Sequence, residues 1–150
     1  MILVMRKKLQ RGRRFRGNFM KLSELKALIV EDDGGKYSDI KNALQACGIR
    51  NLLSASNQEE GFEMIYKAIS EDAPIGLIVT DMNYPLREYA PDDAEAGSKL
   101  IKRLKKEFLD IPVIVCSSDP YHIEDVLGCV WYSKLRDLYM DFKTILQGLM

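Results

Sequence analysis

The sequence predicts a three-layer α/β domain in which helices cover both faces of a five-stranded parallel sheet. Short, nearly continuous apolar runs rich in Ile and Val alternate with amphipathic stretches from residue 26 onward. Such runs are typical of strands buried on both faces, and their alternation with helices is typical of a parallel sheet. With 150 residues, 47% of them hydrophobic, the chain can form one domain around its own core.

The five apolar runs are the expected strands. They span residues 27–30, 52–55, 75–80, 112–116 and 129–132. Each is shorter than the roughly 10–12 residues expected of a buried helix, so the strand interpretation is favoured.

The amphipathic stretches have the spacing of helices that pack one face on a core. Ile40, Ala43, Leu44 and Cys47 fall at i, i+3, i+4 and i+7, and Gly48 follows as a C-terminal stop. Similar stripes run from Phe62 to Ile69, from Leu100 to Phe108 and from Leu138 to Leu149. The stripe from Leu100 to Phe108 lies opposite a basic face made of Lys99, Lys102, Arg103, Lys105 and Lys106.

The composition excludes several classes of protein. No stretch approaches the roughly 18–20 uninterrupted apolar residues of a membrane helix, and the N-terminal order of apolar and basic residues is the reverse of a signal peptide. Cys47, Cys116 and Cys129 have no paired spacing, which favours a reducing, cytoplasmic environment. The lone His122 cannot anchor a multi-histidine metal site.

The net charge of zero hides a basic N-terminus on an acidic body. Residues 1–20 contain seven Lys or Arg and no acidic residue, so the rest of the chain holds 15 basic and 22 acidic residues. We expect residues 1–20 to be a disordered leader, or sequence upstream of a start at Met20, and residues 21–150 to form the domain. A nucleic-acid contact by the basic arm is the alternative, which we do not favour.

Charged or hydroxyl side chains follow four of the expected strands. They are Glu31-Asp32-Asp33 after the first strand, Asp81 after the third, Ser117-Ser118 after the fourth and Lys134 after the fifth. The C-terminal ends of parallel strands lie along one edge, where open α/β sheets bind ligands, so we expect these groups to converge.

The chemistry of this set points to a phosphoryl group. Gathered carboxylates repel one another and recruit a cation, and an all-oxygen cluster suits a hard ion such as Mg²⁺. The metal and Lys134 would offset charge on phosphoryl oxygens, Ser117 would donate a hydrogen bond, and Asp81 would be the nucleophile. Asp33 or Asp32 alone is also a typical helix N-cap.

The four segments that carry these residues resemble the receiver domain of bacterial response regulators. They are residues 28–32, 78–85, 112–117 and 131–134, and the resemblance extends over residues 26–149. It implies a flavodoxin-like (βα)5 sandwich with strand order 2-1-3-4-5. It also implies that Asp81 accepts a phosphoryl group from a histidine kinase.

The resemblance assigns roles to the remaining site residues. Asp32, Asp81 and the Asn83 backbone carbonyl would hold Mg²⁺, and Glu31 would assist through water. Two further residues would act in switching: Ser117 would move toward the phosphoryl group, and Trp131 would take the position of the switching aromatic residue.

The chain departs from the receiver pattern in three places. Leu135 stands where receivers carry a cis-proline after the lysine, and a cis bond before a non-proline residue costs about 2.5–4 kcal/mol. The loop of residues 86–96 is longer than usual. The segment from Ser117 to Lys134 is shorter, so its helix is expected to shrink to about two turns around residues 122–127 or to be irregular.

The leading interpretation is a stand-alone cytoplasmic receiver, a monomer or weak dimer that is phosphorylated by a histidine kinase or phosphotransfer protein and binds a downstream protein. The alternative is a receiver-like module that is not phosphorylated and docks through its altered fourth helix, fifth strand and fifth helix. A turnover enzyme such as a phosphatase is not favoured, because Asn83 cannot serve as the acid/base carboxylate beside the nucleophile.

Overall fold

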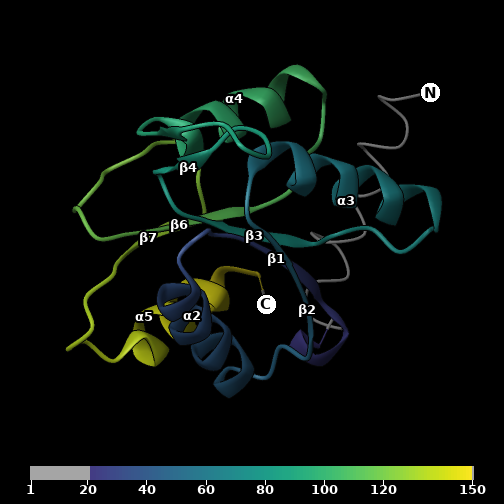
Figure 1. The fold of residues 1–150 in the computed structure, drawn as a ribbon. Helices are drawn as coiled ribbons and strands as arrows, with labels where there is room; N and C mark the ends of the chain where they lie inside the picture. The colour runs from purple at the N-terminus through teal and green to yellow at the C-terminus, as the bar shows by residue number, and fades with distance from the viewer. Residues whose placement is uncertain (1–20, 150) are drawn as a thin grey trace.

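A five-stranded parallel sheet forms the centre of the computed structural model, which describes residues 21–149 (Figure 1). The strands are β1 (Lys26–Val30), β2 (Asn51–Ala55), β3 (Leu77–Thr80), β6 (Val113–Ser117) and β7 (Gly128–Trp131). Their order is β2-β1-β3-β6-β7, which confirms the predicted flavodoxin-like topology. The predictions for residues 1–20 lie outside the described residues.

Four α-helices of the described chain pack against this sheet (Figure 1). They are α2 (Gly34–Ala46), α3 (Gln58–Ser70), α4 (Ala96–Lys106) and α5 (Leu138–Leu146), with short 3-10 helices at Leu22–Glu24 and Gln147–Leu149. Side chains cap three of them: Asp33 caps α2, Asn57 caps α3 and Asp137 caps α5. The predicted stop at Gly48 is confirmed, since Gly48 has a φ of 101° just past the end of α2.

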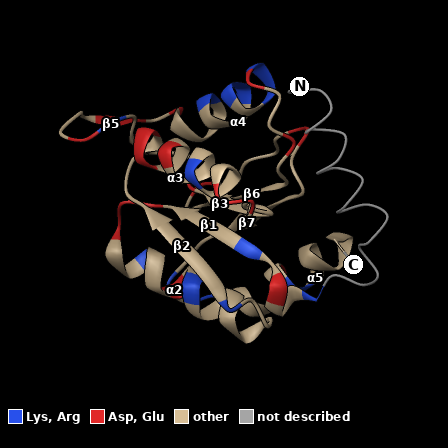
Figure 2. Ribbon diagram, turned by 90° about the vertical axis from the view of Figure 1, so that its right-hand side faces the viewer, with Lys and Arg blue, Asp and Glu red and all other residues tan. Residues whose placement is uncertain are grey.

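Two apolar clusters lie on opposite faces of the sheet. The first is formed with α2 and α5 and includes Ile40, Leu44 and Phe142. The second is formed with α3 and α4 and includes Phe62 and Leu100. Each strand contributes to one or both clusters because successive side chains point to opposite faces, as the continuous apolar runs predicted. On the outer side of α4, Figure 2 shows the expected basic residues.

The connection from β6 to β7 has no helix. The described residues 118–127 form bends and turns, so the irregular form that the sequence left open is observed, and the two-turn helix is wrong. Ile123 and Val126 of this segment pack against the second cluster and cover part of the sheet that a helix would cover. Leu127, at the end of the segment, packs against the first cluster on the other face of the sheet.

The long loop after β3 contains a small hairpin. Its strands are β4 (Tyr84–Pro85) and β5 (Asp92–Asp93), which pair antiparallel. Tyr84 is fully buried and anchors the base of the hairpin, whereas Tyr89 near the tip is 97% exposed. The hairpin extends away from the sheet beside α3 and α4 (Figure 2).

Within residues 21–149, every helix is too short or too polar to cross a lipid bilayer.

Candidate functional site

Asp81 is the first residue after the central strand β3. Its backbone NH donates to the Val30 carbonyl of the neighbouring strand β1 at 3.2 Å. Gly97, in the first turn of α4, packs on the other side. A Cβ there would lie 2.5 Å from the Asp81 carbonyl oxygen, so only glycine allows the helix to approach this closely. The backbone around Asp81 is therefore held between β1 and α4, and its side chain is 13% exposed.

The acidic loop after β1 combines structural and site roles. Glu31 Oε1 accepts a hydrogen bond from the Asp33 NH at 3.0 Å. Asp33 Oδ1 accepts from the NH groups of Gly35 and Lys36 at 2.9 and 3.1 Å, which caps α2 as predicted. These bonds fix the loop so that Glu31 points inward, while Asp32 stays exposed.

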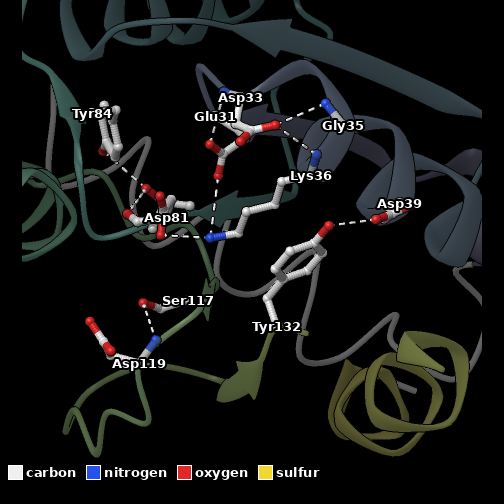
Figure 3. Close-up of polar contacts among 11 residues, drawn as sticks. Glu31, Asp33, Gly35, Lys36, Asp39, Asp81, Tyr84, Ser117, Asp119 and Tyr132 are labelled. Carbon is white, nitrogen blue, oxygen red and sulfur yellow. Dashed lines mark hydrogen bonds and ion pairs between the residues drawn. The ribbon is translucent and has the colours of Figure 1, made fainter. Parts of the chain in front are cut away.

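A buried lysine lies between the two carboxylates. Lys36 Nζ is 2.8 Å from Asp81 Oδ1 and 3.5 Å from Glu31 Oε2, and the residue is only 5% exposed (Figure 3). Its ammonium also lies 5.2 Å from the centre of the Tyr132 ring, within range of a cation–π contact. A buried ammonium needs such partners, because burying an unpaired charge costs on the order of several kcal/mol.

The pKa values of the acidic residues reflect burial and mutual repulsion. Burial and the charge of Asp81 raise the pKa of Glu31 to about 7, and Lys36 offsets part of this rise. Burial and the nearby Asp92 of the β4–β5 hairpin raise the pKa of Asp32. By contrast, the backbone NH groups that Asp33 caps lower its pKa. Burial and the closeness of other carboxylates therefore disfavour the charged forms of Glu31 and Asp32.

Ser117 ends β6 on the neighbouring side of Asp81. It is 6% exposed, and its Oγ accepts a hydrogen bond from the Asp119 NH at 3.3 Å. Figure 3 shows its side chain at the same edge of the sheet as Asp81 and the Lys36 ammonium. The predicted convergence of Glu31, Asp81 and Ser117 is thus what the structure contains.

Lys134 lies in the loop between β7 and α5, where its charge helps to lower the pKa of Asp33. Its side chain is exposed and lines a cavity of about 280 Å³ together with Asp39 and Asn42 of α2. The strand register explains this position. Thr80 pairs with Val115, which places Asp81 level with Cys116, and Cys116 pairs with Val130. Lys134 therefore comes four residues after the level of Asp81, beyond the end of β7.

The two aromatic residues at the end of β7 have different environments. Trp131 is 50% exposed, donates from Nε1 to the Ser118 carbonyl at 2.9 Å, and lies 5.2 Å from the Arg136 guanidinium. Tyr132 is 8% exposed, and its hydroxyl donates to Asp39 Oδ2 of α2 at 2.5 Å. The buried tyrosine therefore ties the end of β7 to α2 beside Lys36.

The site offers oxygen donors of the type that bind a divalent metal ion. Within the described residues no three His, Cys, Asp or Glu side chains are arranged to hold an ion by themselves. Mg²⁺, however, usually keeps several waters and needs only one or two carboxylates. Buried Glu31 Oε2 accepts no hydrogen bond, and burial and neighbouring carboxylates raise the pKa values of Glu31 and Asp32. Asp32 and Asp81 are oxygen donors of the kind that such an ion prefers.

Two residues of the site were missed by the sequence analysis. Lys36 continues the apolar stripe of Ile40, Ala43 and Leu44 one turn toward the helix start, and this spacing was the available signal. Asp92 reaches Asp32 through the pairing of β4 with β5, which no local pattern of the sequence indicates.

The chain shares its fold with solved receiver domains. The phosphorylated cyanobacterial phytochrome response regulator RcpA aligns over 83% of this chain and 93% of its own, with a TM-score of 0.64 and 18% identity. TrrA from Thermotoga maritima, in complex with Mg²⁺ and BeF, aligns over 84% and 99%, with a TM-score of 0.63 and 18% identity. The Mn²⁺-bound response regulator Rcp1 aligns over 81% and 91%, with a TM-score of 0.56 and 21% identity.

No protein-family model matches the sequence, and a comparison with curated proteins finds no significant match. The fold class is the flavodoxin-like α/β sandwich. More narrowly, the fold is that of response regulator receiver domains, as the resemblance of the four sequence segments implied.

Proposed function

We propose that this chain is a response regulator receiver in which Asp81 accepts a phosphoryl group from a sensor histidine kinase or a phosphotransfer protein. The observation that carries the proposal is the position of Asp81, at the end of the central strand with a buried ammonium 2.8 Å from Oδ1. The receiver fold of the chain supports it.

In the proposed reaction, a carboxylate oxygen of Asp81 attacks the phosphorus of a phosphohistidine and forms an acyl phosphate. The bond from phosphorus to the imidazole nitrogen breaks, and the imidazole leaves with the electron pair and takes up a proton from solvent. The transition state carries negative charge on the phosphoryl oxygens, so positive charge at the site accelerates the step.

A Mg²⁺ ion supplies part of this positive charge when it is bound. Asp32, Asp81 and the Asn83 backbone carbonyl would hold it, with Glu31 acting through water. Glu31 Oε2, which accepts no hydrogen bond and lies 3.5 Å from Lys36 Nζ, and the closeness of Asp81 to Glu31 support a cation here. The solved structures of TrrA with Mg²⁺ and of Rcp1 with Mn²⁺ support a divalent ion in this fold.

The residues at the ends of β6 and β7 are proposed to sense the phosphoryl group. Ser117 Oγ would release the Asp119 NH and donate to a phosphoryl oxygen, and Ser118 leaves room beside it. Trp131 would change its environment when residue 118, whose carbonyl it contacts, moves. These steps would convert a local charge of about −1.5 to −2 into a shift between two conformers.

The output of this switch would be contact with a downstream protein in the cytoplasm. We propose a signalling protein rather than a turnover enzyme, since Asn83 provides no acid/base carboxylate beside Asp81. A monomer or weak dimer would suffice for this role, and it requires neither a membrane nor nucleic acid.

Acetyl phosphate with Mg²⁺ tests the proposal without knowledge of the kinase. We expect the intact mass of the protein to increase by one phosphoryl group, and we expect Asp81→Asn to take up none. Chelation of Mg²⁺ should abolish uptake by the unaltered protein. Failure of the unaltered protein to gain mass with several small phosphodonors would overturn the proposal.

The second candidate function is a docking module that needs no phosphorylation. It is favoured by one observation, the absence of a helix in the described segment 118–127, which changes the surface beside β7. It requires that Asp81→Asn, which removes the acceptor, leaves partner binding unchanged. The first proposal requires binding that depends on Asp81.

A further inference from the structure

We propose, resting on the function above, that Lys36 of α2 is the lysine that contacts the phosphoryl group on Asp81, in the role that the sequence pattern assigns to Lys134. The structure brings an ammonium to Asp81 from the first helix of the domain instead of from the loop after the last strand.

The first step is the reach of Lys36. Its Nζ lies 2.8 Å from Asp81 Oδ1. In the acyl phosphate, one carboxylate oxygen of Asp81 bridges to phosphorus and the other remains as the carbonyl oxygen. If a phosphoryl group is added to Asp81, the Lys36 ammonium can reach its oxygens by rotation about the bonds of the flexible lysine side chain. An ammonium is a compact point charge with three donors, so it can keep one bond to the carboxyl group while it forms another to a phosphoryl oxygen.

The second step is the way the fold aims this side chain inward. Lys36 lies on the buried face of α2 with Ile40, Ala43 and Leu44. The Asp33 side chain bonds the Lys36 NH at 3.1 Å and so fixes the first turn of the helix. The Tyr132 ring lies 5.2 Å from the ammonium, and the Tyr132 hydroxyl is bonded to Asp39 one turn further along α2. The ammonium is therefore positioned before any phosphoryl group arrives.

The third step is the position of Lys134. Val130 of β7 is level with Asp81, and Lys134 comes four residues later, beyond the end of the strand. It lies in an exposed loop that also carries Leu135, which is 98% exposed. The Leu135 NH bonds Ser133 Oγ at 3.3 Å and the Arg136 NH bonds the Ser133 carbonyl at 3.0 Å, which makes a local turn. In this arrangement the ion pair to Asp81 comes from Lys36.

The fourth step is charge. Glu31 and Asp81 are both largely buried, and Lys36 is the cation that pairs with both of them. A phosphoryl group increases the negative charge at this point, which strengthens the attraction for the same ammonium. Lys36 and a bound Mg²⁺ would share this charge, because both are attracted by Asp81.

The test compares the rate of phosphoryl uptake from acetyl phosphate and Mg²⁺ in two matched variants, Lys36→Met and Lys134→Met. Each removes one ammonium and keeps a flexible apolar stem. We expect Lys36→Met to lower the rate by at least about tenfold, as expected when one donor to a developing charge is lost. We expect Lys134→Met to remain within about twofold of the unaltered protein, since Lys134 lines the cavity beside α2 and the ion pair to the acceptor comes from Lys36.

A second measurement separates contact with the phosphoryl group from a role in folding. Titration of each protein with Mg²⁺ alone, followed by calorimetry, should give Lys36→Met an affinity equal to or higher than that of the unaltered protein, because the competing ammonium is gone. A loss of Mg²⁺ affinity parallel to the loss of uptake would mean that Lys36 only maintains the site, which would overturn the proposal.

If Lys36→Met does not fold, Lys36→Arg and Lys134→Arg replace the pair. Arginine keeps the charge, but its larger planar group does not fit the position of the ammonium. We then expect slower uptake for Lys36→Arg alone. Loss of uptake in the Lys134 variants with normal uptake in the Lys36 variants would overturn this inference and leave the role of Asp81 intact. No uptake by the unaltered protein would instead overturn the proposed function.

Discussion

The half of the site that follows β1 and β3 and the half that follows β6 and β7 meet at one edge of the sheet but are built differently. In the first half, Glu31, Lys36 and Asp81 are buried, and hydrogen bonds and an ion pair link them. In the second half, Ser117 is buried, but Trp131 and Lys134 are exposed and the preceding connection lacks a helix.

This difference shows that the position of a strand in the sheet, more than the type of residue that follows it, determines whether that residue has fixed surroundings. β1 and β3 are neighbours in the middle of the sheet with helices packed on both faces, so the groups that follow them have fixed surroundings. β7 is an edge strand that follows a shortened connection, so the residues beyond it are free to form a turn of their own. A lysine from the well-packed half then occupies the place beside Asp81.

Matched isoleucine truncations should give the largest contrast between the halves. Ile78 of β3 is fully buried, whereas Ile123 of the β6–β7 connection is partly buried against the same cluster. We expect Ile78→Ala to lower the free energy of unfolding by about 2–5 kcal/mol and Ile123→Ala by less than about 2 kcal/mol. Chemical denaturation measures both. Equal losses would mean that the connection is packed as firmly as the central strand.

Gly97 tests how tightly the backbone of Asp81 is held. A Cβ at residue 97 would lie 2.5 Å from the Asp81 carbonyl oxygen and 2.7 Å from Met82 Sδ. We expect Gly97→Ala to cost about 1–3 kcal/mol of stability through overpacking and to slow phosphoryl uptake by displacing Asp81.

Gly34→Ala in the first turn of α2 is the control for this substitution, because no atom lies within 4 Å of the added Cβ. Its stability should be unchanged or higher by less than about 1 kcal/mol. If both alanine variants behave alike, the close approach of α4 to Asp81 does not constrain the site.

The Tyr132–Asp39 hydrogen bond should give a smaller, pH-dependent effect. This bond raises the pKa of Tyr132 to about 12, so the folded protein holds the phenol proton more tightly than the unfolded chain, where the pKa is about 10. The stabilisation is therefore complete below pH 10 and is lost as the pH rises from 10 to 12.

We expect Tyr132→Phe to cost about 1 kcal/mol near neutral pH, since Asp39 is exposed to solvent, and the difference from the unaltered protein should vanish by pH 12. Thermal melts across this pH range measure it. The pKa values of Tyr66 and Tyr84 are also raised by burial. Because both tyrosines are present in both proteins, the difference in stability between the proteins reports the contribution of Tyr132 alone. A difference that grows with pH would contradict the assignment.

The fold, the acidic half of the site and Ser117 were predictable from sequence because their signals are local. Continuous apolar runs identified the strands, and Glu31, Asp81 and Ser117 directly follow or end those runs. Parallel pairing then brings them together without further information.

The remaining features depend on contacts between distant segments. Lys36 precedes the apolar stripe of its helix and, as a charged residue, does not look like part of a buried face. The place of Lys134 depends on the register of β7 against β6 after a connection of unusual length. Asp92 reaches Asp32 only because β5 pairs with β4. The helical spacing of Lys36 is the one local signal among these features, and the register of β7 and the pairing of β4 with β5 have none.

Chemical trapping of the acyl phosphate tests the central claim most directly. The protein is treated with acetyl phosphate and Mg²⁺, reduced with borohydride, which converts an aspartyl phosphate to homoserine, and mapped by peptide mass spectrometry. The account predicts conversion at Asp81, with a rate that falls in Lys36→Met and not in Lys134→Met. Conversion at another carboxylate, or conversion at Asp81 that depends on Lys134 alone, would contradict it.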